Sequence, residues 1–297
     1  MTSIVLGYIL AVTSALFHTL YIIPRKLSKQ KPIYYIFYMG IGFLLSSVLL
    51  CIVCLCLHIE LDLVNPILIY AIIAGILSMI ASISVVIAID KIGLSRSNQW
   101  KNLQGPIGAM LIFLFFSEGT NTKILLLLIA IAAIFTSAIL LTIKQGKEKI
   151  DKKGILYALI AAIAYGINAL MRKYTSDANL IYEQQLYSSF FMFLSASVYI
   201  LIKDKNIRKI GSIKKKDNKL AILAGAIYYF AVYFYIIAYK YIQGSIAYTI
   251  VQLNAVFTIF LGIFVFKELA FRKNWLRITI GTLLAVIGLF ILMLAQK

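Results

Sequence analysis

The fold is decided by the segment AIIAGILSMIASISVVIAIDKIGLSRSNQWKNLQGPIGAMLIFLFFSE (residues 71–118), because a second copy of it lies 150 residues further along the chain. The copy is AILAGAIYYFAVYFYIIAYKYIQGSIAYTIVQLNAVFTIFLGIFVFKE (residues 221–268), and 13 of the 48 aligned positions are identical without a gap. A match of this length indicates a duplicated unit. The organisation of one half of the chain therefore predicts that of the other half.

Apolar runs long enough to cross a bilayer continue along the whole chain. A helix that crosses the roughly 30 Å hydrocarbon layer needs about 20 apolar residues. The runs are continuous rather than alternating, which favours helices over a β-barrel. We therefore predict an all-α polytopic membrane protein with ten transmembrane helices, over residues 3–23, 33–57, 65–89, 95–116, 122–143, 154–174, 180–202, 219–239, 244–266 and 275–295.

The composition excludes most soluble classes of protein. Apolar residues make up 62% of the 297 positions and charged residues only 13%, against roughly 45–50% and about 25% in ordinary soluble domains. This balance excludes a cytosolic enzyme, a disordered chain and a disulfide-stapled secreted module. Cys51, Cys54, Cys56, His18 and His58 do not form the spacing of a metal site. Since there is no phosphate-binding loop and no carboxylate pair within a span, we predict neither an enzyme nor a cofactor.

The basic residues indicate how the chain lies in its membrane. The formal net charge is +18, but lysine and arginine stand in short bursts between apolar runs, which argues against binding of nucleic acid. Loops after odd-numbered spans hold 22 of the 29 basic residues, and the other loops with the tail hold five. Basic loops stay in the cytoplasm, against the anionic lipids of the inner leaflet. We predict a multi-pass protein of the cytoplasmic membrane with both termini outside.

The two halves also match at their beginnings. With a shift of 147 residues, Gly7 falls on Gly154 and Ala11 on Ala158. Each half then contains five spans, and because five is an odd number, the second half enters the membrane upside down relative to the first. Inverted repeats of this kind build many secondary transporters, in which the halves exchange conformations around a site at the midplane. The two predicted units are residues 1–148 and residues 149–297.

Three stretches resemble a known family: AYKYIQGSIAYTIVQLNAVFTIFLGIFVFKE (238–268), GTLLAVIGLFILM (281–293) and the weaker copy AIDKIGLSRSNQWKNLQGPIGAMLIFLFFSE (88–118). They resemble the drug/metabolite transporter superfamily, in its ten-helix, EamA-like branch, and IGLSRS is similar to the glucose/ribose porter group. The resemblance implies a cavity between spans one, three, four, six, eight and nine. Spans five and ten would lie outside, at a packing surface or a homodimer interface. Asn254-Ala255 departs from the family, because many members carry a proline there.

Polar side chains at membrane depth are the candidate solute ligands, because burying such groups is expensive. The fourth span is the most polar, and Asn98, Lys101 and Asn102 share one helical face ahead of Pro106, which invites a kink. Positions that the repeat relates carry further polar or aromatic groups in both halves. The predicted solute-binding residues are His18, Tyr21, Asn98, Lys101, Asn102, Tyr165, Asn168, Tyr228, Tyr235, Tyr248 and Gln252.

Each of these side chains also has a plainer interpretation. Lys101 could extend to lipid headgroups, and the tyrosines could pack in the interior or form an interfacial aromatic belt. The amides could make ordinary hydrogen bonds between helices. His18 could carry a coupling proton, or it could remain neutral and hydrogen-bonded.

Uncharged polar groups and tyrosines predominate among the candidates, which favours a neutral sugar or polyol as the solute. Tyrosine rings stack on the C–H face of a sugar or on an organic cation. We therefore predict a secondary-active transporter that works by alternating access, with a proton or a sodium ion as coupling ion. Amino acids, organic cations and drugs remain alternative substrates. The alternative of another class is a channel or a structural membrane protein, although a channel more typically carries a repeated filter or a charged ring.

Overall fold

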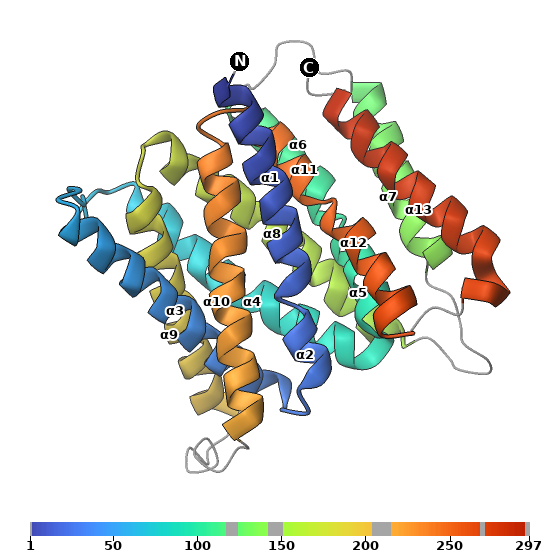
Figure 1. Cartoon of the computed structure of the whole chain (residues 1–297), viewed down its shortest axis with the longest axis horizontal. Coiled ribbons are helices and arrows are strands. Elements are labelled where there is room, and N and C mark those ends of the chain that lie inside the picture. Colours follow the sequence, from blue (N-terminus) through green and yellow to red (C-terminus); the bar gives the residue numbers. More distant parts are fainter. Residues whose placement is uncertain (1, 117–123, 142–150, 204–214, 268–270, 295–297) are drawn as a thin grey trace.

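The computed structural model describes residues 2–116, 124–141, 151–203, 215–267 and 271–294, and these residues form helices and connections without a strand (Figure 1). Helices occupy all ten predicted spans in this part of the chain, and eight of the segments are long and apolar enough to cross a bilayer. The helices are α1 (Thr2–Leu20), α2 (Ile23–Leu27), α3 (Pro32–Cys56), α4 (Leu68–Ile92), α5 (Leu94–Lys101), α6 (Gln104–Phe116), α7 (Ile124–Leu141), α8 (Lys152–Asp177), α9 (Ile181–Lys203), α10 (Lys215–Ala238), α11 (Gly244–Val251), α12 (Asn254–Phe260), a π-helical turn (Leu261–Val265) and α13 (Phe271–Leu294).

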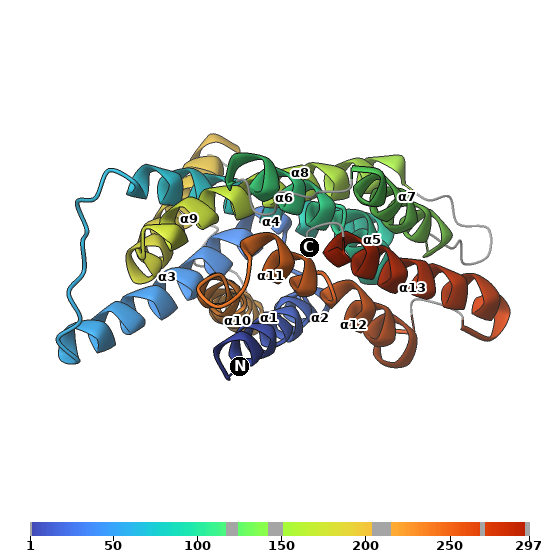
Figure 2. The same ribbon diagram turned by 90° about the horizontal axis from the view of Figure 1, so that it is seen from above.

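Helices from the two halves of the chain pack against each other in the centre of the molecule (Figures 1 and 2). The most extensive central contacts join α4 to α8, α3 to α10, α1 to α10, and α9 to both α3 and α4. Most of the core is therefore shared between the halves. The predicted boundary between the two units lies within residues 142–150, outside the described residues.

Glycines set the closest helix crossings. Where α3 crosses α10, a Cβ atom on Gly225 would lie 2.0 Å from the carbonyl oxygen of Met39, and a Cβ atom on Gly42 would lie equally close to the backbone of α10. Where α4 crosses α9, a Cβ atom on Gly75 would lie 2.6 Å from the carbonyl oxygen of Ser188. Small residues at such crossings are typical of membrane helices. Because Gly75 and Gly225 occupy the same position of the repeat, both crossings depend on the same kind of residue.

Two central spans are broken, one in each half. The fourth span breaks at Asn102, between α5 and α6, and the ninth breaks at Gln252, between α11 and α12. The first break follows the prediction from Pro106, whose nitrogen donates no backbone hydrogen bond. The second break has no proline. There the Asn254 side chain donates through Nδ2 to the carbonyl oxygen of Val251 at 2.7 Å, and such side-chain bonds compete with the regular helix.

The fifth and tenth spans form a pair at one edge of the molecule (Figure 1). Helix α7 packs chiefly against α13, and the Ser137 hydroxyl donates to the carbonyl oxygen of Gly281 at 2.7 Å. This position agrees with the one that the family resemblance implies for these spans.

The helix bundle has two distinct ends. The beginning of α1 and the end of α13 lie at the same end (Figure 1), as an even number of crossings requires. We call this the terminal end. The other end, where α2 and α4 finish and α8 begins, carries Arg25, Lys91 and Lys153, and we call it the basic end.

Candidate functional site

A small enclosed cavity lies at the centre of the bundle. The centre of a water molecule can occupy a volume of about 10 Å³ in this cavity. The cavity therefore has room for about one water. The lining side chains are all buried and come from both halves of the chain. They are His18, Tyr21, Lys101, Gln104, Tyr165, Asn168, Tyr228, Tyr235 and Tyr248. Eight of these nine belong to the predicted solute-binding residues.

Lys101 is the charged residue of the lining, and only 1% of it is exposed. Its ammonium nitrogen lies 5.8 Å from the centre of the Tyr165 ring and 6.0 Å from that of the Tyr21 ring. Aromatic faces attract cations, and Lys101 also ends the short helix α5, where the helix dipole is negative. These weak interactions hold the ammonium at the cavity and exclude the alternative that Lys101 extends to headgroups.

His18 contributes a ring whose two nitrogens are distinguished by their surroundings. Its Nδ1 lies 2.9 Å from the carbonyl oxygen of Ser14, which can only accept a hydrogen bond. The Nδ1 atom therefore carries a proton, and in the neutral ring Nε2 is an acceptor. The Ser14 hydroxyl donates to the Ala231 carbonyl oxygen at 2.6 Å and ties α1 to α10. The histidine is thereby held against the tyrosines of α10.

Tyrosines form much of the cavity wall. Tyr228 and Tyr235 lie seven residues apart on one face of α10, as their spacing predicts, and both rings contact His18, with centres 6.2 and 5.9 Å away. The Tyr165 and Tyr248 hydroxyls have partners outside the cavity, since Tyr165 lies 2.9 Å from the Ser82 hydroxyl and Tyr248 donates to the Tyr165 carbonyl oxygen at 3.1 Å. These hydroxyl contacts fix the two rings in the lining.

Asn168 belongs to a buried polar network behind the lining. Its Nδ2 atom donates to the Ala74 carbonyl oxygen at 2.6 Å and to the Ser78 hydroxyl at 2.9 Å. Its Oδ1 atom accepts a hydrogen bond from Arg172, which is completely buried. Arg172 also donates to Ser78 at 3.1 Å and to Gln185 at 3.5 Å. The network positions Asn168 and places a second cation close to the cavity.

Three predicted residues do not line the cavity. Asn98 donates to the side chains of Asn254 and Thr258 at 3.1 and 2.9 Å, so it joins α5 to α12. Gln252 accepts from Gln104 at 2.9 Å and donates to the Tyr248 carbonyl oxygen, so it joins the two breaks. The third residue, Asn102, is buried at the first break itself. Asn98 and Gln252 therefore hold the broken spans together, whereas the Asn102 side-chain oxygen has no hydrogen-bond partner among the described residues.

Gln104 is the lining residue that the periodicity missed. On an unbroken helix, residue 104 would point away from the face that carries Asn98 and Asn102. Gln104 follows Lys101 by three residues, and both side chains reach the cavity from the same side of the span, whereas Asn98 and Asn102 do not. The available signal was a polar residue directly before Gly105-Pro106.

Ion pairs close the basic end of the bundle. The buried Arg25 guanidinium donates to both carboxylate oxygens of Asp90, with Nε at 3.1 Å, and to the Gln30 carbonyl oxygen at 2.6 Å. Nearby, Lys91 pairs with Asp151 at 2.7 Å, and this ammonium holds the pKa of the Asp151 carboxyl below its usual range. A second small cavity, which Tyr21 and Arg25 both line, separates the Arg25–Asp90 pair from the central cavity.

Aromatic contacts close the terminal end. The rings of Tyr70 and Tyr174 stack with centres 4.3 Å apart, and Phe116 lies 4.6 Å from Tyr174. The ammonium of Lys173 lies 5.2 Å from the centre of the Phe116 ring and pairs with Asp177. The central cavity therefore lies between packed side chains at both ends of the bundle.

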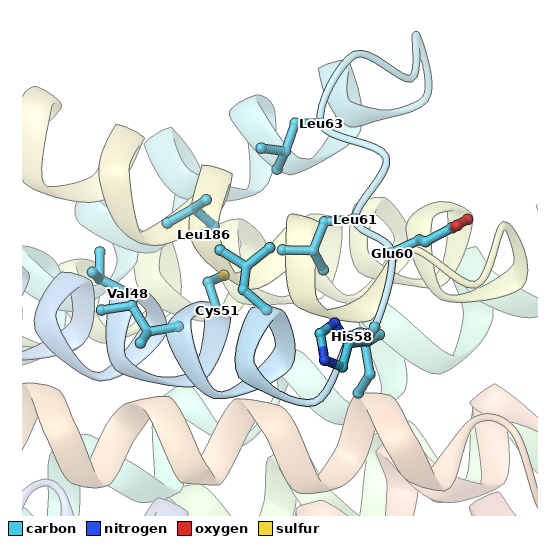
Figure 3. A pocket seen from close by; sticks show the side chains of 10 residues that line it. Val48, Cys51, His58, Glu60, Leu61, Leu63 and Leu186 are labelled. Carbon is cyan, nitrogen blue, oxygen red and sulfur yellow. The ribbon is translucent and has the colours of Figure 1, made fainter.

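A larger hollow lies at the edge of the molecule, between α3, α9 and residues 57–67 (Figure 3). The space open to the centre of a water molecule is about 670 Å³ there. Side chains such as Val48, Leu61 and Leu186 make its lining mainly apolar, with His58 and Glu60 as exceptions. This lining suits acyl chains better than a polyhydroxylated solute. The central cavity is therefore the candidate site, although it is the smaller of the two.

Ten helical spans around an enclosed polar cavity define a multi-pass membrane protein of the transporter type. A family described as "Sugar transport protein" matches residues 9–295, and the chain belongs to this family. The family lies in the drug/metabolite transporter-like class of membrane proteins, so the predictions of a membrane transporter for sugars are confirmed.

Solved structures agree with the fold. One of them, described as "Crystal structure of protein", is 14% identical to this chain, with a TM-score of 0.69, and the match covers 98% of each chain. At this identity the likeness shows a common fold. A search among curated proteins found no match.

Proposed function

We propose that this sugar transporter works by alternating access and that the central cavity is its solute site. The observation that carries this proposal is the cavity itself, which is buried at the centre of the bundle and receives polar and aromatic side chains from both halves. Tyrosine rings stack on the C–H faces of a sugar, and amide and imidazole groups exchange hydrogen bonds with its hydroxyls. Because there is room for about one water, the lining must move apart to admit a solute.

The relation between the halves supports an inverted repeat. Helix α1 runs toward the basic end, whereas its repeat partner α8 begins there, next to Lys91. The same shift of 147 residues brings Arg25 onto Arg172. Arg25 closes the basic end, and Arg172 is buried in the other half, five residues before the end of α8. Exchange of the two arrangements would open one end while it closes the other.

The distribution of charge supports an orientation in the cytoplasmic membrane, with the basic end in the cytoplasm and both termini outside. The anionic inner leaflet would hold the basic loops. The ten-helix, EamA-like branch, a proton or sodium ion as coupling ion, and a homodimer that contacts through α7 and α13 stay predictions.

Other solutes fit the cavity less well. An organic cation or a cationic drug would meet the charge of Lys101 at close range. A free amino acid brings an ammonium group as well, and no carboxylate lines the cavity among the described residues. A channel is a weaker alternative, because the path is closed at both ends by packed side chains rather than lined by a ring of charges.

Transport in vesicles tests the proposal. The purified protein in proteoliposomes, preloaded with unlabelled sugar, should take up labelled sugar faster than empty vesicles do and in a saturable manner, because a carrier exchanges solutes across the membrane. Flux that neither saturates nor responds to sugar on the far side would exclude the carrier mechanism.

A matched pair of variants on α10 tests the site. Tyr235→Ala should remove most of the exchange, because Tyr235 lines the cavity. Tyr233→Ala removes the same side chain two residues away, outside the lining, and should leave exchange close to normal. Equal exchange by the two variants, at equal amounts of folded protein, would contradict the assignment of the central cavity.

A further inference from the structure

The central cavity carries a positive charge without a negative partner. Lys101 is the charged member of the lining. Within the described residues the acidic side chains that pair with bases are remote from it, because Asp90 and Asp151 pair at the basic end and Asp177 pairs at the terminal end. An ammonium group in the interior of a membrane protein is costly unless a charge compensates it.

Arg172 adds to this imbalance. It is completely buried, and its partners are the neutral groups of Asn168, Ser78 and Gln185. Asn168 connects it directly to the cavity lining. The guanidinium therefore has hydrogen bonds to neutral groups and no ion pair within the described part of the chain, and it reinforces the positive potential at the cavity.

From this imbalance we infer that the preferred solute is a sugar acid, whose carboxylate binds the Lys101 ammonium while Tyr165, Tyr228 and Tyr235 surround its ring. The inference rests on the proposed function, because it requires the central cavity to be the solute site. A carboxylate carries one negative charge and matches a single ammonium in the lining. A phosphate ester carries nearly two negative charges, and of the two cations only Lys101 lines the cavity and can contact it directly, since Arg172 donates to Asn168, Ser78 and Gln185.

The rest of the lining suits the remainder of such a solute. His18 Nε2 is an acceptor in the neutral ring, and Gln104 and Asn168 carry amides. Tyr21 adds a buried hydroxyl to the same lining. These groups are neutral and can exchange hydrogen bonds with hydroxyls. A neutral sugar would use them equally well but would leave Lys101 without a counterion.

Binding to the purified full-length protein tests the inference. Isothermal titration in lipid nanodiscs would compare D-glucuronate, D-glucose and D-glucose 6-phosphate, with acetate as a control for the carboxylate alone. We expect glucuronate to bind about tenfold more tightly than glucose, the difference that a charge-assisted hydrogen bond gives over a neutral one. We expect acetate to bind far more weakly, because it lacks the ring.

Two variants connect this preference to Lys101. Lys101→Met keeps most of the side-chain volume without the charge, and it should bring the ratio of the glucose Kd to the glucuronate Kd from about ten to about one. Lys101→Arg keeps the charge and should retain part of the preference, which guards against an effect of misfolding. The melting temperature of each variant in detergent checks that it folds. We expect that of Lys101→Met to rise, because the variant removes an uncompensated buried charge.

The outcomes are distinguishable. Glucose binding as tightly as glucuronate, or a preference that survives in Lys101→Met, would overturn the inference and leave the sugar site in place. Tighter binding of glucose 6-phosphate would replace the carboxylate with a phosphate and also overturn it. If neither sugar nor sugar acid binds and none is exchanged in vesicles, the proposed function itself fails.

Discussion

Arg25 shows how a single residue holds one end of the molecule closed. It is 5% exposed, it donates to both oxygens of Asp90, and its guanidinium carbon lies 5.1 Å from the centre of the Tyr35 ring. A buried arginine without its carboxylate is strongly destabilised. The closed arrangement of the basic end therefore depends on Asp90.

The variant Asp90→Asn should favour opening of the basic end, because Arg25 loses its counter-charge. A cysteine in place of Val86, which lines the second small cavity, would report this opening in a chain whose native Cys51, Cys54 and Cys56 are changed to alanine. We expect its reaction with a water-soluble thiol reagent to accelerate several-fold, on the order of tenfold for a shift of about 1.4 kcal/mol.

The variant Asp90→Glu is the control for this measurement, since it keeps the carboxylate and should react at nearly the original rate. An unchanged rate in Asp90→Asn would mean that the ion pair does not hold the closed state.

At the scale of residues, the sequence identified which buried polar side chains matter better than it identified where each of them lies. The cost of burying polar groups pointed to His18, Lys101 and Asn168, and all three line the cavity. The same argument selected Asn98 and Gln252, which join helices instead. Cost alone does not distinguish a ligand from a packing bond, because both kinds of group need a polar partner.

Among the helices, the crossing of α3 and α10 gives the sharpest test of packing. Gly225→Ala should lower stability by about 1–3 kcal/mol, because the added methyl group meets the carbonyl oxygen of Met39. Gly154→Ala is the matched control. There the new Cβ atom would meet side-chain atoms instead of a backbone carbonyl, namely Ile92 Cγ2 at 2.6 Å and Lys91 Cβ at 2.9 Å, and alanine favours a helix by up to about 1 kcal/mol over glycine, which offsets part of the strain.

Thermal unfolding in detergent would compare the two variants. We expect a larger fall in melting temperature for Gly225→Ala than for Gly154→Ala, because only the first variant meets a backbone oxygen at 2.0 Å. Equal falls would mean that the backbone contact at Gly225 adds nothing to the cost of a methyl group.

The two broken spans differ in how far the local sequence predicts them. Pro106 predicts the first break, because a proline removes a backbone donor. Nothing in the local pattern around Gln252 predicts the second, where the Asn254 side chain replaces the proline in function. The Asn254 side chain is held at this break because it also accepts a hydrogen bond from Asn98 on α5. This contact joins residues that are 156 positions apart in the chain.

For the whole molecule, cysteine labelling can test which end of the bundle faces the cytoplasm. Lys29 is exposed at the basic end and Glu60 is exposed in the connection between α3 and α4. In a chain without its native cysteines, Glu60→Cys should react with a membrane-impermeant thiol reagent on intact cells. Lys29→Cys should react only after the membrane is permeabilised, because basic loops stay inside.

Each of these two positions is the experimental control for the other, since both side chains are accessible in the folded protein. The reverse pattern would place the basic end outside and would contradict the assignment of both termini to the outer side.

The sequence by itself determined the ten helical spans and most of the cavity's side chains, because hydropathy, helical period and the cost of burying a polar group can be read from the residues themselves. Only the tertiary structure decided which polar groups reach the cavity, as the contrast between Gln104 and Asn102 shows. It also decided that the closed ends rest on Arg25–Asp90 and Tyr70–Tyr174. The physical reason is that the surroundings of a polar side chain, and the partner of a buried charge, depend on residues far away in the chain.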